Sequence, residues 1–201
     1  MRKNKTRILT FCALCAAVNF VGGFTALTLR LPVYLDSIGT ILAAIVLGPF
    51  YGMLTGLATS VINAALFDPI TIWFTPVQLL TALLTGLMFR NHRFSGWKSI
   101  ASILVITVCG SALSSVIAGC VFDGVTSSGS SMIVAVLKNS GMNVITAVFS
   151  TQILTDIADR AISFGLSFSV IKLMPKSYLY ALESEAETYK LRFKKGRKRV
   201  F

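Results

Sequence analysis

Long apolar runs alternate with short polar segments along most of the chain. Several runs approach the roughly 20 residues that an α-helix needs to cross a bilayer, and such runs predict membrane-spanning helices. Gly48-Pro49 separates a short second run from the third, so we expect these two runs to form a tight helical hairpin. Thr75-Pro76 is typical of a helix start, because proline is tolerated at the first helical position. The pattern predicts six spans, at residues 8–29, 38–47, 53–67, 75–89, 99–122 and 144–173.

The composition agrees with a membrane protein. Of 201 residues, 54% are hydrophobic and 13% are charged, whereas an ordinary soluble domain carries about 25% charged residues. We therefore expect an all-α fold, a polytopic six-helix transmembrane bundle, with the membrane domain at residues 1–175, including a short outer helix near 132–137, and a tail at 176–201. The first run is longer than the apolar core of a cleaved signal peptide, so we expect it to remain as a span.

The basic residues predict the orientation of the bundle. The formal net charge is +11, but the excess lies at the two ends of the chain and in the segment at 90–98. This distribution follows the positive-inside rule and does not suggest a nucleic-acid partner. Both termini and the loops after the second and fourth spans are then cytoplasmic, whereas the segments 30–36, 68–74 and 123–138 face outward.

The tail carries an apolar stripe. Tyr178, Leu182, Ala186, Tyr189 and Phe193 recur at helical spacing ahead of a basic cluster at 194–199. This spacing indicates an amphipathic helix at the membrane surface with a polybasic anchor. A solvated charged tail that only satisfies the positive-inside rule is the alternative.

The residues needed for catalysis are missing. The single histidine, His92, lies in a basic cytoplasmic loop, so neither a Ser-His pair in the membrane nor a zinc-protease motif can be assembled. Cys12 and Cys15 have CxxC spacing but lie inside an apolar run without a second pair, which argues against a metal or redox site. The chain has no phosphate-binding loop for ATP. We expect no enzyme activity, catalytic residue, metal or cofactor, and active transport would need partner proteins.

Polar side chains near the outward segments indicate a binding pocket. Amide side chains at the ends of spans, with acidic and aromatic residues in the outer loops, give the mixture that small-molecule sites use. For Tyr34 and Trp73, the aromatic belt at the membrane surface is an alternative role. The candidate substrate-binding residues are Tyr34, Asp36, Asn63, Asp68, Trp73, Gln78, Asn139 and Asn143.

Other polar residues lie within the predicted spans. A charge at the centre of a bilayer costs about 2.5 to 3.5 kcal/mol on insertion scales, so Asp156, Asp159 and Arg160 need compensation. Asp156 and Arg160 are one helical turn apart, and we expect them to pair; a role in ion coupling or substrate contact is the alternative. This triplet should lie in the inner half of its span, away from the outward pocket. Asn19 is expected to hydrogen-bond to a neighbouring helix.

Small residues recur at four-residue spacing in two runs, where they let helices approach closely. In the third run they predict packing within the bundle, at Gly52, Gly56, Ser60 and Ala64. In the first run, Ala13 and Ala17 form an A-x-x-x-A motif.

Four stretches together resemble the substrate-binding S component of energy-coupling factor (ECF) transporters, over about residues 7 to 175. The first is a basic start followed by Phe11-Cys-Ala-Leu-Cys-Ala-Ala17, and the second is Leu31-Pro-Val-Tyr-Leu-Asp-Ser-Ile-Gly-Thr40. The third is Leu47-Gly-Pro-Phe-Tyr-Gly-Met-Leu-Thr-Gly56, and the fourth is Asp156-x-x-Asp-Arg-Ala-Ile-Ser163 running into Leu173-Met-Pro175.

The resemblance implies a vitamin importer subunit in a bacterial plasma membrane. In that family the A-x-x-x-A motif contacts the transmembrane coupling (T) subunit, which assigns partner docking to Ala13 and Ala17. Two cytoplasmic ATPase subunits would supply the energy, and a small vitamin would be the ligand. The stretch at 34–40 is most similar to S components for pyridoxine-type vitamins, so a B6-like ligand is the implied substrate, with a cobalamin or modified-base precursor as a rival. A membrane sensor or scaffold, or a solitary proton-coupled secondary transporter, remains an alternative function.

Overall fold

The fold is entirely helical in the part of the chain that the structure describes. The structure is a computed structural model that describes residues 3–89 and 96–197, with side chains at 6–89 and 96–186. No strand occurs in these ranges, which confirms the all-α prediction. His92, residues 90–95 of the basic segment and residues 198–199 of the basic tail cluster lie outside these ranges. The elements are α1 (Lys3–Thr28), α2 (Ile38–Leu47), α3 (Pro49–Leu66), the 3-10 helix η1 (Pro69–Phe74), α4 (Thr75–Met88), α5 (Gly96–Phe122), α6 (Ser130–Asn139), α7 (Val144–Leu173) and α8 (Lys176–Arg197).

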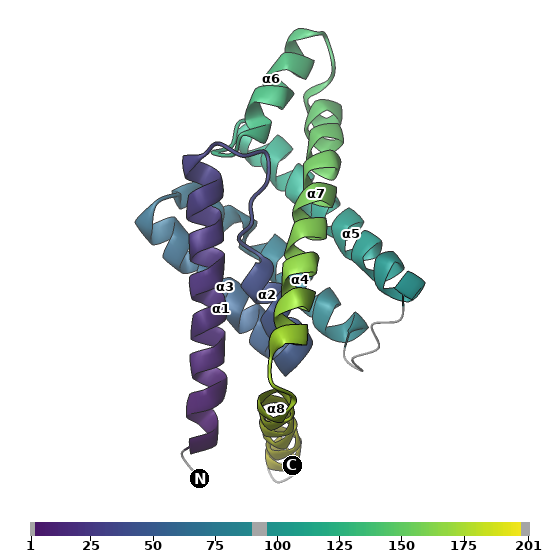
Figure 1. The fold of residues 1–201 in the computed structure, drawn as a ribbon. Coiled ribbons are helices and arrows are strands. Elements are labelled where there is room, and N and C mark those ends of the chain that lie inside the picture. The colour runs from purple at the N-terminus through teal and green to yellow at the C-terminus, as the bar shows by residue number, and fades with distance from the viewer. Residues whose placement is uncertain (1–2, 90–95, 198–201) are drawn as a thin grey trace.

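Three helical segments of the described chain are long and apolar enough to cross a membrane: Thr6–Thr28, Pro69–Met88 and Gly96–Phe122. They support a membrane protein, and the count of six spans stays a prediction. The start of α1 and α8 lie at one end of the bundle, and α6 lies at the opposite end (Figure 1).

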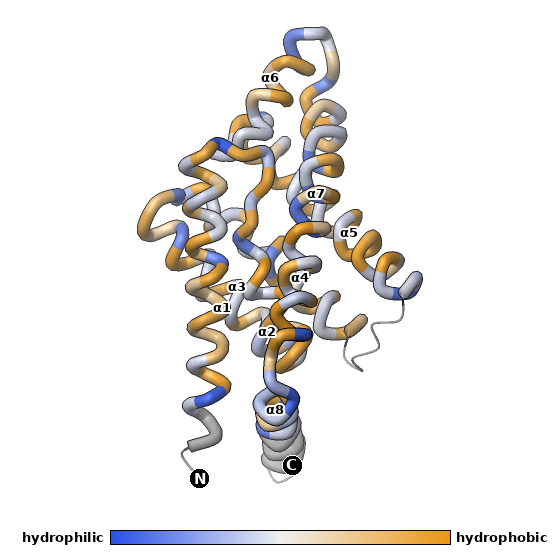
Figure 2. Tube along the Cα trace, viewed as in Figure 1, coloured by the Kyte–Doolittle hydropathy of each residue, from blue (hydrophilic) through white to orange (hydrophobic). Residues whose placement is uncertain are grey.

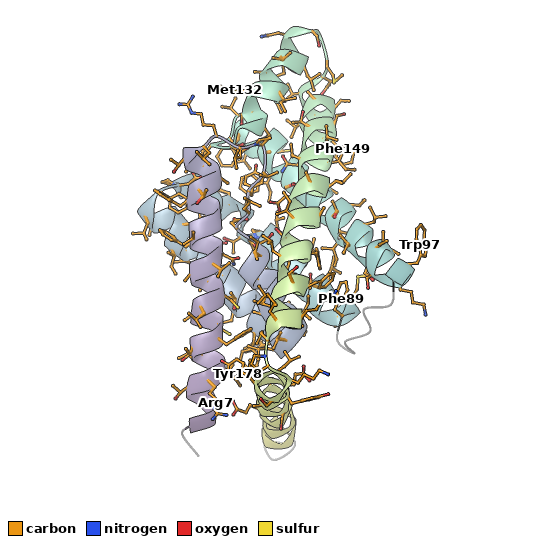
Figure 3. The ribbon with its side chains drawn as sticks, in the orientation of Figure 1. Arg7, Phe89, Trp97, Met132, Phe149 and Tyr178 are labelled. Carbon is orange, nitrogen blue, oxygen red and sulfur yellow. The ribbon has the colours of Figure 1, made fainter. Side chains whose placement is uncertain are left out.

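The shortest apolar helix lies at the centre of the bundle. Every residue of α2 is buried, and α2 packs against α1, α3, α4, α7 and α8. A helix that is apolar on all sides is stable only when it is surrounded, and Figure 2 shows hydrophobic colour along α2 and most of α1. At the outer surface of the bundle, Trp97 of α5 and Phe149 of α7 point away from the other helices (Figure 3).

A buried asparagine joins three helices. The Nδ2 of Asn19 in α1 donates to Thr40 Oγ1 of α2 and to Thr59 Oγ1 of α3, both at 2.9 Å. Its Oδ1 accepts the main-chain N–H of Gly39 at 2.6 Å. The expected interhelical role of Asn19 is confirmed. Gly39 permits the contact, because a Cβ there would lie 1.9 Å from the main-chain oxygen of Cys15.

The small residues of α3 face its neighbours within the bundle. A Cβ added at Gly52 would lie 2.6 Å from the Ala44 Cβ of α2, and one at Gly56 would lie 3.3 Å from Thr40. Ser60, one turn further, is fully buried. The prediction that this stripe serves packing within the bundle is confirmed for Gly52, Gly56 and Ser60, whereas Ala64 is partly exposed.

Helix α8 packs against the end of the bundle where α1 begins. Leu182 and Ala186 are buried in the same apolar cluster as Ile8 of α1, and Arg7 Nη1 donates to Glu185 Oε1 at 3.5 Å. Figure 3 shows Arg7 beside α8. Part of the apolar stripe of the tail is therefore covered by protein.

We predict that Gly39→Ala destabilises the bundle, because the added methyl group collides with the backbone of α1. Overpacking of this kind costs about 1 to 3 kcal/mol or more. The control is Gly165→Ala in α7, where a Cβ meets nothing within 4 Å, and alanine favours a helix over glycine. Thermal unfolding in mild detergent should give a lower Tm for the first variant only. Equal Tm values would contradict this account of the α1–α2 contact.

Candidate functional site

The segment between α1 and α2 runs from the end opposite α8 down into the bundle (Figure 1). It is held by α7. Asp159 Oδ1 accepts the main-chain N–H of Tyr34 at 3.1 Å and that of Leu35 at 2.8 Å. Arg160 Nη1 donates to Ser37 Oγ at 2.7 Å. Two stretches that lie far apart in the sequence thus form one hydrogen-bonded unit, which we call the loop anchor.

Two hollows lie beside this segment, and Tyr34, Asp36 and Thr71 belong to the walls of both. The first hollow lies between α1, α3 and η1, and its further polar wall residues are Asn63, Asp68, Ser127 and Ser128. The second lies between α4, α5 and α7, and its further polar wall residues are Gln78, Ser114, Gln152, Asp156, Asp159 and Arg160. Apolar walls with a few polar groups are typical of small-molecule sites.

The charged triplet of α7 lines the second hollow. The expectation that it lies away from the pocket is wrong. The loop carries Tyr34 and Asp36 down to the middle of α7, a helix of 30 residues that is about 45 Å long at 1.5 Å per residue. The expected ion pair is also wrong: within the described residues no Arg160 nitrogen lies within 4.0 Å of Asp156, which instead accepts from Ser111 Oγ at 2.7 Å.

Five of the eight candidate substrate-binding residues lie together. Tyr34, Asp36, Asn63, Asp68 and Gln78 line one hollow or both. The other three lie elsewhere. Trp73 is 55% exposed and meets the Phe122 ring edge-on. Asn139 and Asn143 are exposed near the α6–α7 turn, where Asn143 Oδ1 caps α7 by accepting the N–H of Ile145 at 3.0 Å.

Serine residues close one side of the first hollow, and sequence reasoning missed them. Asp68 accepts hydrogen bonds from the Thr71 hydroxyl at 3.0 Å, the Ile70 N–H at 3.2 Å and the Ser127 hydroxyl. The Tyr34 hydroxyl donates to Ser128 Oγ at 3.2 Å. Residues 123–131 are rich in glycine and serine, which is typical of a loop, but this composition carries no signal that the segment reaches Tyr34 and Asp68.

The electrostatics of the site centre on Asp36. Burial raises the pKa of its carboxyl to about 6, the negative charge of Asp159 raises the pKa further, and Arg160 lowers it. Asp36 is therefore mostly ionised at pH 7 and mostly neutral at pH 5. Burial also raises the pKa of Tyr34, so its phenol stays protonated at neutral pH.

Two buried amide oxygens in the walls have no hydrogen-bond partner. Asn63, whose Oδ1 is unpaired, is a wall residue of the first hollow, and Gln78, whose Oε1 is unpaired, is a wall residue of the second. The Gln78 amide nitrogen is used, because it donates to the main-chain oxygen of Asp36 at 3.1 Å. A buried acceptor without a partner costs about 1 to 3 kcal/mol, so both oxygens favour a ligand that supplies donors. Among the described residues, no group of three or more His, Cys, Asp or Glu side chains is arranged to hold a metal ion.

The A-x-x-x-A motif lies on the outside of α1. Ala13 and Ala17 are exposed, as are the adjacent Leu14 and Val18, whereas Asn19 is buried on the opposite face. The motif therefore makes a flat apolar strip that is available to another membrane protein.

The fold and these hollows describe a helical membrane protein with two polar-lined hollows between its helices. The family model for the substrate-specific component of ECF transporters matches residues 7–171. The chain therefore belongs to the family of ECF transporter substrate-specific components. No curated protein and no solved structure matches it.

We predict that Asp159→Ala releases the loop at 33–36, because the variant removes the acceptor of two main-chain N–H groups. Hydrogen–deuterium exchange of peptides that cover Tyr34 and Leu35 should accelerate by tenfold or more, since about 1.4 kcal/mol of lost protection corresponds to tenfold. The control is Asp123→Ala, which removes an exposed ion pair with Lys138. Unchanged exchange at 33–36 in Asp159→Ala would show that the loop is held by other contacts.

Proposed function

We propose that this S component captures a small vitamin of B6-like character from outside the cell and passes it to the cytoplasm of a bacterium. It acts in the plasma membrane as a multi-pass subunit, together with a T subunit and two cytoplasmic ATPases. The family supports a substrate-specific transport subunit. The single observation that carries the proposal is that Tyr34 and Asp36, from the family-like stretch at 31–40, line both hollows.

The lining of the hollows supports a binding role for several wall residues. Tyr34 and Phe74 offer aromatic surface to a flat heterocycle, while Asn63 and Gln78 offer free oxygens. Asp159 is a positioning residue, since its carboxylate oxygen is occupied by the loop. Such a division between apolar contact and a few directed polar groups gives specificity to a small site.

Native mass spectrometry tests the proposal directly. Protein purified in mild detergent from cells grown in rich medium should carry an adduct of vitamin mass. Protein that is empty should gain one when it is incubated with a panel of B vitamins, pyridoxine-type compounds included. An empty spectrum under both conditions would contradict the proposal and favour a sensor or scaffold.

Gln78→Leu should weaken ligand binding by about 1 to 3 kcal/mol, the usual cost of losing a buried hydrogen bond. The leucine also removes the bond from Gln78 to the Asp36 backbone. Asn143→Leu is the matched control, because Asn143 is exposed and lines neither hollow. Isothermal titration calorimetry with the vitamin found by mass spectrometry measures the dissociation constant of each variant. Equal losses of affinity in the two variants would indicate that the site lies nearer the α6–α7 turn.

Ala13→Trp and Ala17→Trp should abolish uptake and leave ligand binding unchanged. A bulky side chain on the exposed strip of α1 prevents close helix approach by the T subunit but lies away from both hollows. Val116→Trp, on an exposed position of α5, is the control. Radiolabelled uptake in cells that express the whole transporter, with binding measured on the purified subunit, separates the two effects. Normal uptake by both alanine variants would remove the docking role.

A further inference from the structure

The walls of the two hollows carry a surplus of negative charge. The second hollow is lined by the carboxylates of Asp36, Asp156 and Asp159 and by the guanidinium of Arg160. Asp68 adds a further carboxylate to the first hollow, which it shares with Asp36. Among the described residues, Arg160 is the one basic side chain in either wall. A hollow lined by charge of one sign concentrates counter-ions, and low-dielectric walls strengthen this effect.

The carboxylates differ in how far the protein already uses them. Asp159 holds two main-chain N–H groups, and Asp68 accepts three hydrogen bonds. Asp156 accepts from Ser111 and, at 3.4 Å, from Gln152. Asp36 belongs to both hollows and has no Lys, Arg or His nitrogen within 4.0 Å in the described chain. Of the four carboxylates, Asp36 is therefore the one that a ligand in either hollow would meet.

The free amide oxygens point to the same kind of ligand independently of charge. Asn63 is 1% exposed and Gln78 is 6% exposed, and the oxygen of each has no partner. An amide oxygen accepts hydrogen bonds and cannot donate them. A ligand that satisfies these walls must bring donors.

Arg160 does not reverse this preference. Its guanidinium is held by Ser37 Oγ at 2.7 Å, and it lies next to Asp159 along α7 and one turn from Asp156. An anionic ligand near Arg160 would also meet the carboxylates that line the same hollow, and like charges in a partly buried site repel strongly.

We propose that the hollows select a small organic cation that carries hydrogen-bond donors, such as a protonated amine or a cationic nitrogen heterocycle, with its positive charge beside Asp36. The donors reach Gln78 Oε1 or Asn63 Oδ1. This inference rests on the proposed function in one respect, namely that the hollows are the ligand site, and it deepens that function by naming the charge class of the substrate.

Charged thiol reagents measure the preference without knowledge of the ligand. A cysteine is introduced by Thr71→Cys, at a partly exposed position in both walls. The background carries Cys109→Ala and Cys120→Ala and keeps the buried Cys12 and Cys15. The cationic trimethylammonium-ethyl and the anionic sulfonato-ethyl methanethiosulfonates are then compared at low salt. The ratio of the two rates cancels differences in thiol reactivity.

The reference position is Met132→Cys, which is exposed on α6 and points away from the bundle (Figure 3). The ratio of cationic to anionic rate at Thr71→Cys should exceed the ratio at Met132→Cys by roughly tenfold or more. Adding Asp36→Asn should lower this excess severalfold, and adding Asp123→Asn, an exposed acidic residue outside both walls, should leave it unchanged. Val33→Cys, in the first hollow, provides the same reading if Thr71→Cys does not fold.

Equal ratios at the two positions, or an excess that favours the anion, would overturn the proposal. So would an excess that Asp36→Asn leaves intact, or a hollow cysteine that neither reagent reaches. The result is independent of transport. A cation preference in a protein that binds no vitamin would contradict the proposed function alone, whereas a bound vitamin with no cation preference would contradict this inference alone.

Discussion

The site depends on the loop anchor, in which α7 holds an irregular backbone segment deep in the bundle. A charge within a membrane protein is costly unless its hydrogen-bonding capacity is used. Asp159 uses its charge to accept the N–H groups of Tyr34 and Leu35, and Arg160 binds Ser37 at the start of α2. The anchor supplies an acceptor to backbone N–H groups of the loop that have no helical partner. It also gives hydrogen-bond partners to Asp159 and Arg160, which are buried charged side chains of α7.

The anchor also explains the length of α2. A helix of 10 residues is about 15 Å long, about half the thickness of the hydrocarbon core. Residues 29–37, which precede it, have no regular hydrogen-bonding pattern. Irregular backbone in a membrane protein is tolerated where it lines a cavity, and Tyr34 and Asp36 of this segment line both hollows.

The helices were predictable because their signals are local. The runs at 38–47 and 144–173 coincide with α2 and α7, and Thr75-Pro76 does mark the start of α4. The third run was predicted to begin at residue 53, but α3 begins at Pro49, since proline is accepted in the first turn of a helix. Hydropathy alone could not find η1, whose start is fixed by the Asp68 side chain accepting the N–H of Ile70.

The composition of the site was harder to predict than the helices. Tyr34, Asp36 and Gln78 were found because they are polar or aromatic at the ends of apolar runs. Asn139 and Asn143 share that property, yet they lie beyond the hollows because α7 continues well past the loop anchor. Conversely, Asp156 was placed too far from the pocket, because the depth that the loop reaches depends on a contact between residues 125 positions apart. No local pattern in the sequence carries that contact.

The two proposed functions of the chain, ligand binding and partner docking, share one rigid element. Helix α1 is continuous from Lys3 to Thr28. Gly23 forms part of the wall of the first hollow, and a Cβ there would lie 3.2 Å from the Asp36 Cβ. The exposed Ala17 lies six residues earlier in the helix, about 9 Å along its axis. Coupling between two sites requires an element whose position both of them bias. Since α1 packs closely at Gly23 against Asp36 and Asn63, a tilt of α1 produced by a partner at Ala17 would also shift the wall that faces Asp36.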